Sequence, residues 1–143
     1  MKKVILLTGA NGQIGKKLIK KMLSLDHFVI CIDKNYKKNQ ITNKYLKYNL
    51  DITKEIDVKK FFNFLKQKKI NKFDVLINNA ALQNFEQIEN ETLEDFMNVL
   101  AVNVGGSFLL TKYSISFLKK SKNANILNIG SIYGMLSGDP KIY

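Results

Sequence analysis

Three glycines stand at intervals of three residues within residues 8–15, directly after the apolar run at residues 4–7. In such a turn one glycine permits the tight bend, another lets the backbone approach a pyrophosphate, and a third lets the helix pack against a sheet. The N-terminus of that helix offers free N–H groups and the positive end of its dipole to phosphates. The segment therefore predicts a dinucleotide-binding turn with six contributing residues: Gly9, Asn11, Gly12, Gln13, Ile14 and Gly15.

An acidic residue, Asp33, follows the second apolar run, residues 28–32, and stands eighteen positions after Gly15. In dinucleotide-binding units a carboxylate about 20 residues beyond the glycine turn holds the adenosine ribose. A carboxylate there accepts hydrogen bonds from both ribose hydroxyls and repels a 2′-phosphate, so the sequence favours NAD over NADP as cofactor. The neighbouring cation Lys34 would soften that repulsion.

A framework of strands alternating with helices must hold these residues. Short apolar or alternating runs predict five strands, at residues 4–7, 28–32, 45–48, 73–77 and 125–129. Apolar residues at helical spacing predict four helices between them, around residues 14–22, 58–65, 93–100 and 106–120. The alternation predicts an α/β fold, a doubly wound parallel sheet with helices on both faces, right-handed crossovers and the strand order 3-2-1-4-5.

Two local expectations accompany this framework. In the first helix, Ile14, Leu18 and Met22 should face inward, while its lysine doublets face solvent. The polar residues 34–43 lack such a pattern and should form at most one or two helical turns.

Five segments, in this order, resemble the short-chain dehydrogenase/reductase family. They are the glycine turn, Asn-Leu-Asp-Ile-Thr at 49–53, Asn-Asn-Ala-Ala at 78–81, Asn-Val-Gly-Gly at 103–106 and Asn-Ile-Gly-Ser at 128–131. The resemblance covers essentially the whole chain. It implies a Rossmann fold and hydride transfer between a nicotinamide dinucleotide and the carbonyl or hydroxyl carbon of a small-molecule substrate.

The resemblance assigns further cofactor contacts. Asp51 and Ile52 would border the adenine, and Asn79, Ala80 and Ala81 would line the cofactor cleft after the fourth strand. Two positions depart from the pattern. An alanine closes the Asn-Asn-Ala segment where the family usually has glycine, and a glutamine stands at position 13, where the commoner subgroup also has glycine.

For catalysis, the resemblance implies that Asn103 holds a water of the proton relay and that Ser131 hydrogen-bonds the substrate oxygen. The family's acid/base is the tyrosine of a Tyr-x-x-x-Lys pair, in which the lysine lowers the pKa of the phenol. No such pair follows Ser131. Tyr143, twelve residues after Ser131, is one candidate for this tyrosine. Alternatively it belongs to an enlarged loop, as in the bacterial surface-sugar and flagellin-modification oxidoreductases that residues 131–143 resemble.

We therefore expect residues 1–143 to be a single NAD(P)-binding domain, truncated before the Tyr-x-x-x-Lys segment and inactive alone. In full-length form the resemblance implies a homo-oligomer, with Phe108, Leu109 and Phe117 either in the core or at a subunit interface. A non-catalytic dinucleotide-binding module is the alternative, because the glycine turn and the acid of the second strand serve it equally well.

Composition excludes several other classes of function. The net charge is +11, yet every basic residue is lysine. Base readout and bidentate phosphate clamps depend on arginine, so nucleic acid is not an expected partner. With one cysteine and one histidine no metal site is expected. No apolar run approaches the about 18 residues of a membrane span, so we expect no membrane association and a cytoplasmic location.

Overall fold

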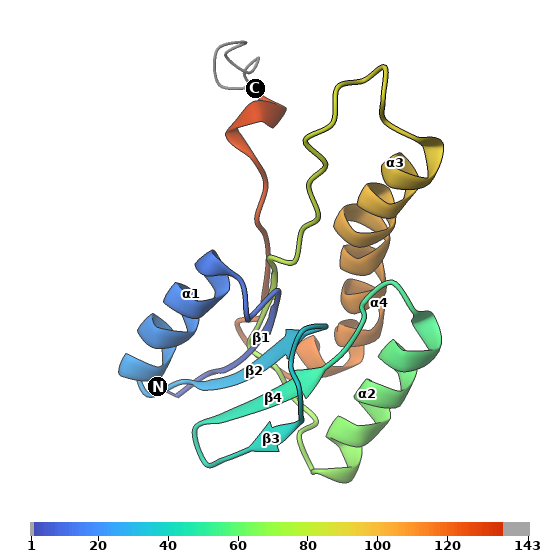
Figure 1. Cartoon of the computed structure of the whole chain (residues 1–143). Coiled ribbons are helices and arrows are strands. Elements are labelled where there is room, and N and C mark those ends of the chain that lie inside the picture. Colours follow the sequence, from blue (N-terminus) through green and yellow to red (C-terminus); the bar gives the residue numbers. More distant parts are fainter. Residues whose placement is uncertain (1, 136–143) are drawn as a thin grey trace.

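The computed structural model describes residues 2–135, apart from the side chain of Tyr133. Within them six strands form one sheet in the order β3-β4-β2-β1-β5-β6 (Figure 1). Five neighbouring strands pair in parallel, and their order is the predicted 3-2-1-4-5, which confirms the fold class. The strands are β1 Val4–Thr8, β2 Phe28–Asp33, β3 Gln40–Ile41, β4 Tyr45–Asn49, β5 Val75–Asn78 and β6 Asn125–Asn128.

The additional strand β3 corrects the expectation for residues 34–43. These residues form no helix; β3 pairs antiparallel with β4 at the edge of the sheet. The segment has no apolar stripe that a helix could bury. Its backbone is instead held by the side chain of Asn49, whose Nδ2 donates to the carbonyls of Lys34 at 3.0 Å and Tyr36 at 2.5 Å.

The predicted helices are present and divide between the two faces of the sheet. α1 covers one face, and α2 and α4 cover the other (Figure 1). α3 runs through a short π-helical segment into α4, so the two predicted helices follow each other without a loop. The bounds are α1 Gln13–Ser24, α2 Glu55–Gln67, α3 Leu93–Leu100, the π-helical segment Ala101–Gly106 and α4 Ser107–Leu118.

Alternate strand residues build two buried clusters, one on each face. Leu6 belongs to the cluster under α2 and α4, where the rings of Phe73 and Phe117 stack with centroids 4.7 Å apart. Leu7 and Cys31 belong to the cluster under α1. Burial raises the pKa of the Cys31 thiol to about 12, so this side chain stays protonated and acts as core.

The inward face of α1 differs from the prediction at one position. Leu18 and Met22 pack against the cluster as expected, whereas Ile14 is 55% exposed. Ile14 lies in the first turn of α1, and its side chain lines a cavity. Among residues 2–135, no helix is long and apolar enough to cross a membrane.

Candidate functional site

The glycine turn connects β1 to α1 and depends on close backbone contacts. Gly9 has a φ of +62°, and a Cβ there would lie 2.8 Å from the Cα of Ala80. A Cβ on Gly15 would lie only 2.3 Å from the carbonyl oxygen of Gly9. Both positions therefore require glycine, one for its dihedral angle and both for space. A Cβ on Gly12 would meet that same oxygen at 3.3 Å, so packing restricts this position less.

The N-terminus of α1 has the features of an anion site. Gly12 is its N-cap residue, with no side-chain cap, and the first turn of α1 contains no acidic residue. The first N–H groups of a helix have no partner within the helix. Here they remain for a phosphate, as the glycine spacing predicts.

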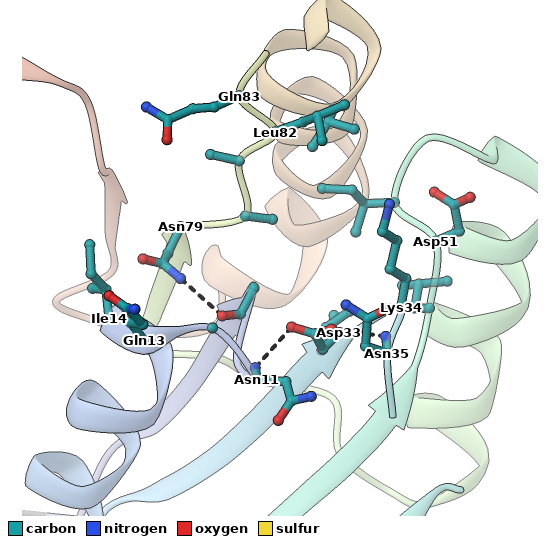
Figure 2. Close-up of a pocket in the computed structure, with 18 residues that line it drawn as sticks. Asn11, Gln13, Ile14, Asp33, Lys34, Asn35, Asp51, Asn79, Leu82 and Gln83 are labelled. Carbon is teal, nitrogen blue, oxygen red and sulfur yellow. Dashed lines mark hydrogen bonds between the residues drawn. The ribbon is translucent and has the colours of Figure 1, made fainter. Parts of the chain in front are cut away.

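Thr8 joins the turn to the end of β5. Its Oγ1 accepts hydrogen bonds from the backbone N–H groups of Asn79 at 3.0 Å and Ala80 at 2.9 Å. In return, Nδ2 of Asn79 donates to the carbonyl of Thr8 at 2.9 Å. It also donates to the carbonyl of Gly9 at 3.2 Å (Figure 2). The Asn-Asn-Ala segment and the glycine turn therefore form one unit, although they are about 70 residues apart in sequence.

Asp33 ends β2 beside the turn and is 9% exposed. Its Oδ2 accepts from the N–H of Asn11 at 2.8 Å, and its Oδ1 accepts from the N–H of Asn35 at 2.9 Å (Figure 2). A carboxylate has about four acceptor positions, so both oxygens can accept further hydrogen bonds.

These elements enclose a cavity of about 550 Å³ at the carboxyl ends of the parallel strands. Eleven of the twelve predicted cofactor residues line it, and the twelfth, Gly15, is buried behind the turn. The eleven are Gly9, Asn11, Gly12, Gln13, Ile14, Asp33, Asp51, Ile52, Asn79, Ala80 and Ala81. Seven further lining residues were not predicted as cofactor contacts: Ile32, Lys34, Asn35, Leu50, Leu82, Gln83 and Val102.

Asp51 contributes a second carboxylate to this cavity. Burial acts to raise its pKa, but hydrogen bonds from Thr53 and the charges of Lys54 and Lys34 outweigh burial and hold the pKa below its ordinary value. Oδ1 of Asp51 accepts from Oγ1 of Thr53 at 2.7 Å and from its N–H at 3.1 Å. Asp51 is therefore ionised and is held by its own loop.

A second cavity, of about 900 Å³, adjoins the first along residues 79–83 and contains two of the predicted catalytic residues, Asn103 and Ser131. Asn103 lies in the π-helical segment. Its Oδ1 accepts from the N–H of Leu82 at 2.8 Å, and its Nδ2 donates to the carbonyl of Leu82 at 3.0 Å. Its side chain thus fixes the loop that both cavities share. The third candidate, Tyr143, lies outside the described residues.

In residues 2–135, no group of three or more His, Cys, Asp or Glu side chains gathers where it could hold a metal ion. The polar groups that line the two cavities are amides, hydroxyls, the carboxylates of Asp33 and Asp51 and the ammonium group of Lys34.

A glycine turn between the first strand and its helix, an acid at the end of the second strand and a cavity at the carboxyl ends of the strands define a dinucleotide-binding Rossmann fold. A family model of the short chain dehydrogenases matches residues 3–141. The chain belongs to this family.

Individual relatives agree with this assignment. The 3-oxoacyl-(acyl-carrier-protein) reductase of Buchnera aphidicola subsp. Baizongia pistaciae is 34% identical over 137 residues, which are 92% of this chain and 56% of that protein. The short chain dehydrogenase from Leptospira borgpetersenii with bound NAD+ has a TM-score of 0.89 and 36% identity, and the match covers 100% of this chain and 57% of that one.

A third relative differs in its cofactor. The structure of ElxO with NADPH bound has a TM-score of 0.83 and 28% identity, and the match covers 96% of this chain and 59% of that one. Nicotinamide dinucleotides of both kinds therefore occur among the relatives. The chain spans a little over half the length of the relatives it matches.

Proposed function

We propose that this chain binds NAD and forms the cofactor-binding part of a reductase that transfers hydride between the nicotinamide and a carbonyl or hydroxyl carbon. One observation carries the proposal: the cavity between the glycine turn and Asp33 continues, along residues 79–83, into a second cavity containing Asn103 and Ser131. Dinucleotide binding alone would not need the second cavity.

The residues of the first cavity fit the parts of a dinucleotide. The uncapped N-terminus of α1 would bind the pyrophosphate, Asp33 would accept the adenosine ribose hydroxyls, and Asp51 with Ile52 would border the adenine. The bound cofactor supplies the hydride. In the second cavity Ser131 would donate to the substrate oxygen, while Asn103 holds the loop that separates the cavities.

Asp33 supports NAD over NADP. Asp33 is 9% exposed, and its carboxylate already accepts two backbone hydrogen bonds. A 2′-phosphate would place a second anion beside it. Calorimetry of the wild-type chain should give a lower Kd for NAD than for NADP, and Asp33→Ser should narrow the difference. Equal affinities in the wild type would contradict the assignment.

We further propose that more polypeptide packs against β6 in the active enzyme. All four residues of β6 are exposed, including Ile126 at 42% and Leu127 at 49%. A strand of a parallel sheet is ordinarily covered on both faces. The relatives are longer by nearly half of their own length, so the acid/base tyrosine and lysine would come with that polypeptide. Turnover by residues 1–143 alone would contradict this proposal.

The outer face of α3, the π-helical segment and α4 supports a homo-oligomer. Of the three residues considered from sequence, Phe117 is buried in the core and Leu109 packs against it, whereas Phe108 is 61% exposed. Met97 and Val104 extend this exposed stripe, and Val104 and Phe108 also line the second cavity. We propose that a second copy covers it, and that Phe108→Asp abolishes a dimer seen by light scattering. A wild-type monomer at high concentration would contradict this.

The substrate class is proposed from two resemblances that differ. The sequence of residues 131–143 resembles that of enzymes acting on surface sugars, whereas the Buchnera relative is named for a 3-oxoacyl group on a carrier protein. In the longer enzyme that we propose above, a panel of nucleotide sugars and 3-oxoacyl thioesters would separate the two classes. The sugar-related class is the one we propose.

A dinucleotide-binding module without redox chemistry is the second candidate function. The glycine turn and Asp33 serve it equally, but Asn103 and Ser131 beside the second cavity favour descent from an enzyme. Calorimetric titration of the chain with NAD at two salt concentrations tests both candidates, with a random oligonucleotide as control. Saturable NAD binding with weak oligonucleotide binding supports them, and the reverse result would favour a polyanion-binding function.

A further inference from the structure

The Asp33 carboxylate connects two loops in the protein without a bound ligand. One partner, the N–H of Asn11, lies in the glycine turn 22 residues earlier, at 2.8 Å. The other, the N–H of Asn35, lies two residues later, at 2.9 Å. Figure 2 shows the carboxylate between the turn and the loop that follows β2. A single buried side chain therefore links two loops that line the first cavity.

The contact with Asn11 holds the half of the turn that faces the phosphate site. The inner half has other supports, since Asn79 donates to the Gly9 carbonyl at 3.2 Å and the N–H of Ala10 donates to the Ile32 carbonyl at 3.1 Å. In the outer half, the Gly12 carbonyl accepts from the N–H of Lys16 in α1 at 3.0 Å. Among the described residues, the contact with Asp33 is the one hydrogen bond that joins this half, Asn11 and Gly12, to β2. Beyond it lies the uncapped N-terminus of α1.

We infer that Asp33 is a positioning residue for the phosphate-binding turn, in addition to the ribose contact assigned above. Its carboxylate fixes residues 9–13 in the shape that receives the pyrophosphate before the ligand arrives. A hydrogen bond to an ionised acceptor is stronger than one between neutral groups. Ordering a loop in advance lowers the entropic cost of binding. The inference rests on the proposed function, namely that this turn binds a dinucleotide.

The positioning role predicts an effect that a ribose contact alone cannot produce. If Asp33 acts only on the ribose hydroxyls, its removal should not change the affinity for a dinucleotide that lacks them. If Asp33 also shapes the turn, its removal should weaken the binding of that dinucleotide as well. An NAD analogue without the adenosine 2′- and 3′-hydroxyls separates the two cases.

Two variants and one control make the test specific. Asp33→Ala removes both acceptors, and Asp33→Asn retains one oxygen, so it can accept from Asn11 or Asn35 but not from both. Asp57→Asn is the control, because Asp57 lies in the first turn of α2 and lines neither cavity. Calorimetry with NAD and the dideoxy analogue is then compared across the wild type and the three variants.

We expect Asp33→Ala to weaken binding of the dideoxy analogue by about tenfold or more, which is the size of one hydrogen bond to a charged group. The affinity of Asp33→Asn for the dideoxy analogue should lie between those of Asp33→Ala and the wild type. Asp57→Asn should bind NAD and the dideoxy analogue with wild-type affinity. Wild-type affinity of Asp33→Ala for the dideoxy analogue would overturn the positioning role, while absence of NAD binding by the wild type would contradict the proposed function instead.

Amide hydrogen exchange tests the same role without any ligand. In the free protein the N–H of Asn11 should exchange at least about tenfold faster in Asp33→Ala than in the wild type. The amides of Leu6 and Leu7 in β1 should keep their protection and so report an intact fold. Unchanged exchange at Asn11 would overturn the inference whether or not NAD binds.

Discussion

Replacing Gly15 by alanine sets helix propensity against close packing. Gly15 is the third residue of α1 and is buried. A Cβ there would lie 2.3 Å from the Gly9 carbonyl oxygen and within 2.8–2.9 Å of two backbone atoms of Ala10. These are backbone atoms of the phosphate-binding turn, so no side-chain rotation can relieve the overlap.

The two effects have opposite signs and different sizes. In the interior of a helix, alanine is more favourable than glycine by about 1 kcal/mol. Inserting an atom into a filled site costs about 1–3 kcal/mol, and rigid backbone neighbours place this case at about 3 kcal/mol. We expect the free energy of unfolding to fall by about 2 kcal/mol, because α1 must move away from the turn by on the order of 1 Å to reach normal contact distances.

Urea unfolding followed by circular dichroism measures this difference. With a slope of about 2 kcal/mol per molar urea, the midpoint should fall by about 1 M. Gly105→Ala is the matched control, because a Cβ there would meet only the Leu100 carbonyl, at 3.9 Å. Gly105→Ala should leave the free energy of unfolding unchanged or raise it. A Gly15→Ala chain as stable as the wild type would refute the close approach of α1 to the turn.

Two further predictions concern the buried Thr8 and the partly buried Asp74. Thr8→Val should lower the free energy of unfolding by about 2 kcal/mol, because the backbone N–H groups of Asn79 and Ala80 lose their acceptor. Thr8→Ser keeps the hydroxyl and should retain most of the wild-type stability. Equal stability of the two variants would contradict the role of the hydroxyl. Burial acts to raise the pKa of Asp74, but hydrogen bonds from Ser121 and other groups outweigh burial and lower it. Its stabilising effect is therefore full above the unfolded-state pKa of about 3.9 and is lost as the pH falls through the lower native value. Between about pH 6 and pH 2 the wild type should lose more stability than Asp74→Asn, and equal losses would contradict this.

The sheet could be predicted from the sequence because its strands are short apolar runs with distinct ends. The distinct ends of these runs also predict where the site lies. A residue such as Asp33 that directly follows a parallel strand must lie at the carboxyl edge of the sheet. The glycine turn fixed the position of α1 relative to that edge. Eleven of twelve predicted cofactor residues line one cavity for this reason.

Other features could not be predicted, because they depend on contacts between distant residues. The polar residues 34–43 have no periodicity, so nothing in them indicated β3. Nothing near Asn103 indicates that its amide holds the backbone of Leu82, twenty-one residues earlier. The spacing of Leu93 and Met97 predicted a helix, but not that their side chains stay exposed. The contact from Asp33 to Asn11 depends on the direction of a backbone N–H, which no residue type specifies.

The central claim is that a nicotinamide dinucleotide binds between the glycine turn and Asp33. Titration of the isotope-labelled chain with NAD, followed by heteronuclear NMR, tests it most directly. The account predicts saturable shifts that concentrate on the amides of Gly12, Gln13, Asp33, Asp51 and Asn79, with weaker effects from NADP. A folded chain whose spectrum does not change with NAD, or whose shifts concentrate on the lysine-bearing outer face of α1, would contradict it.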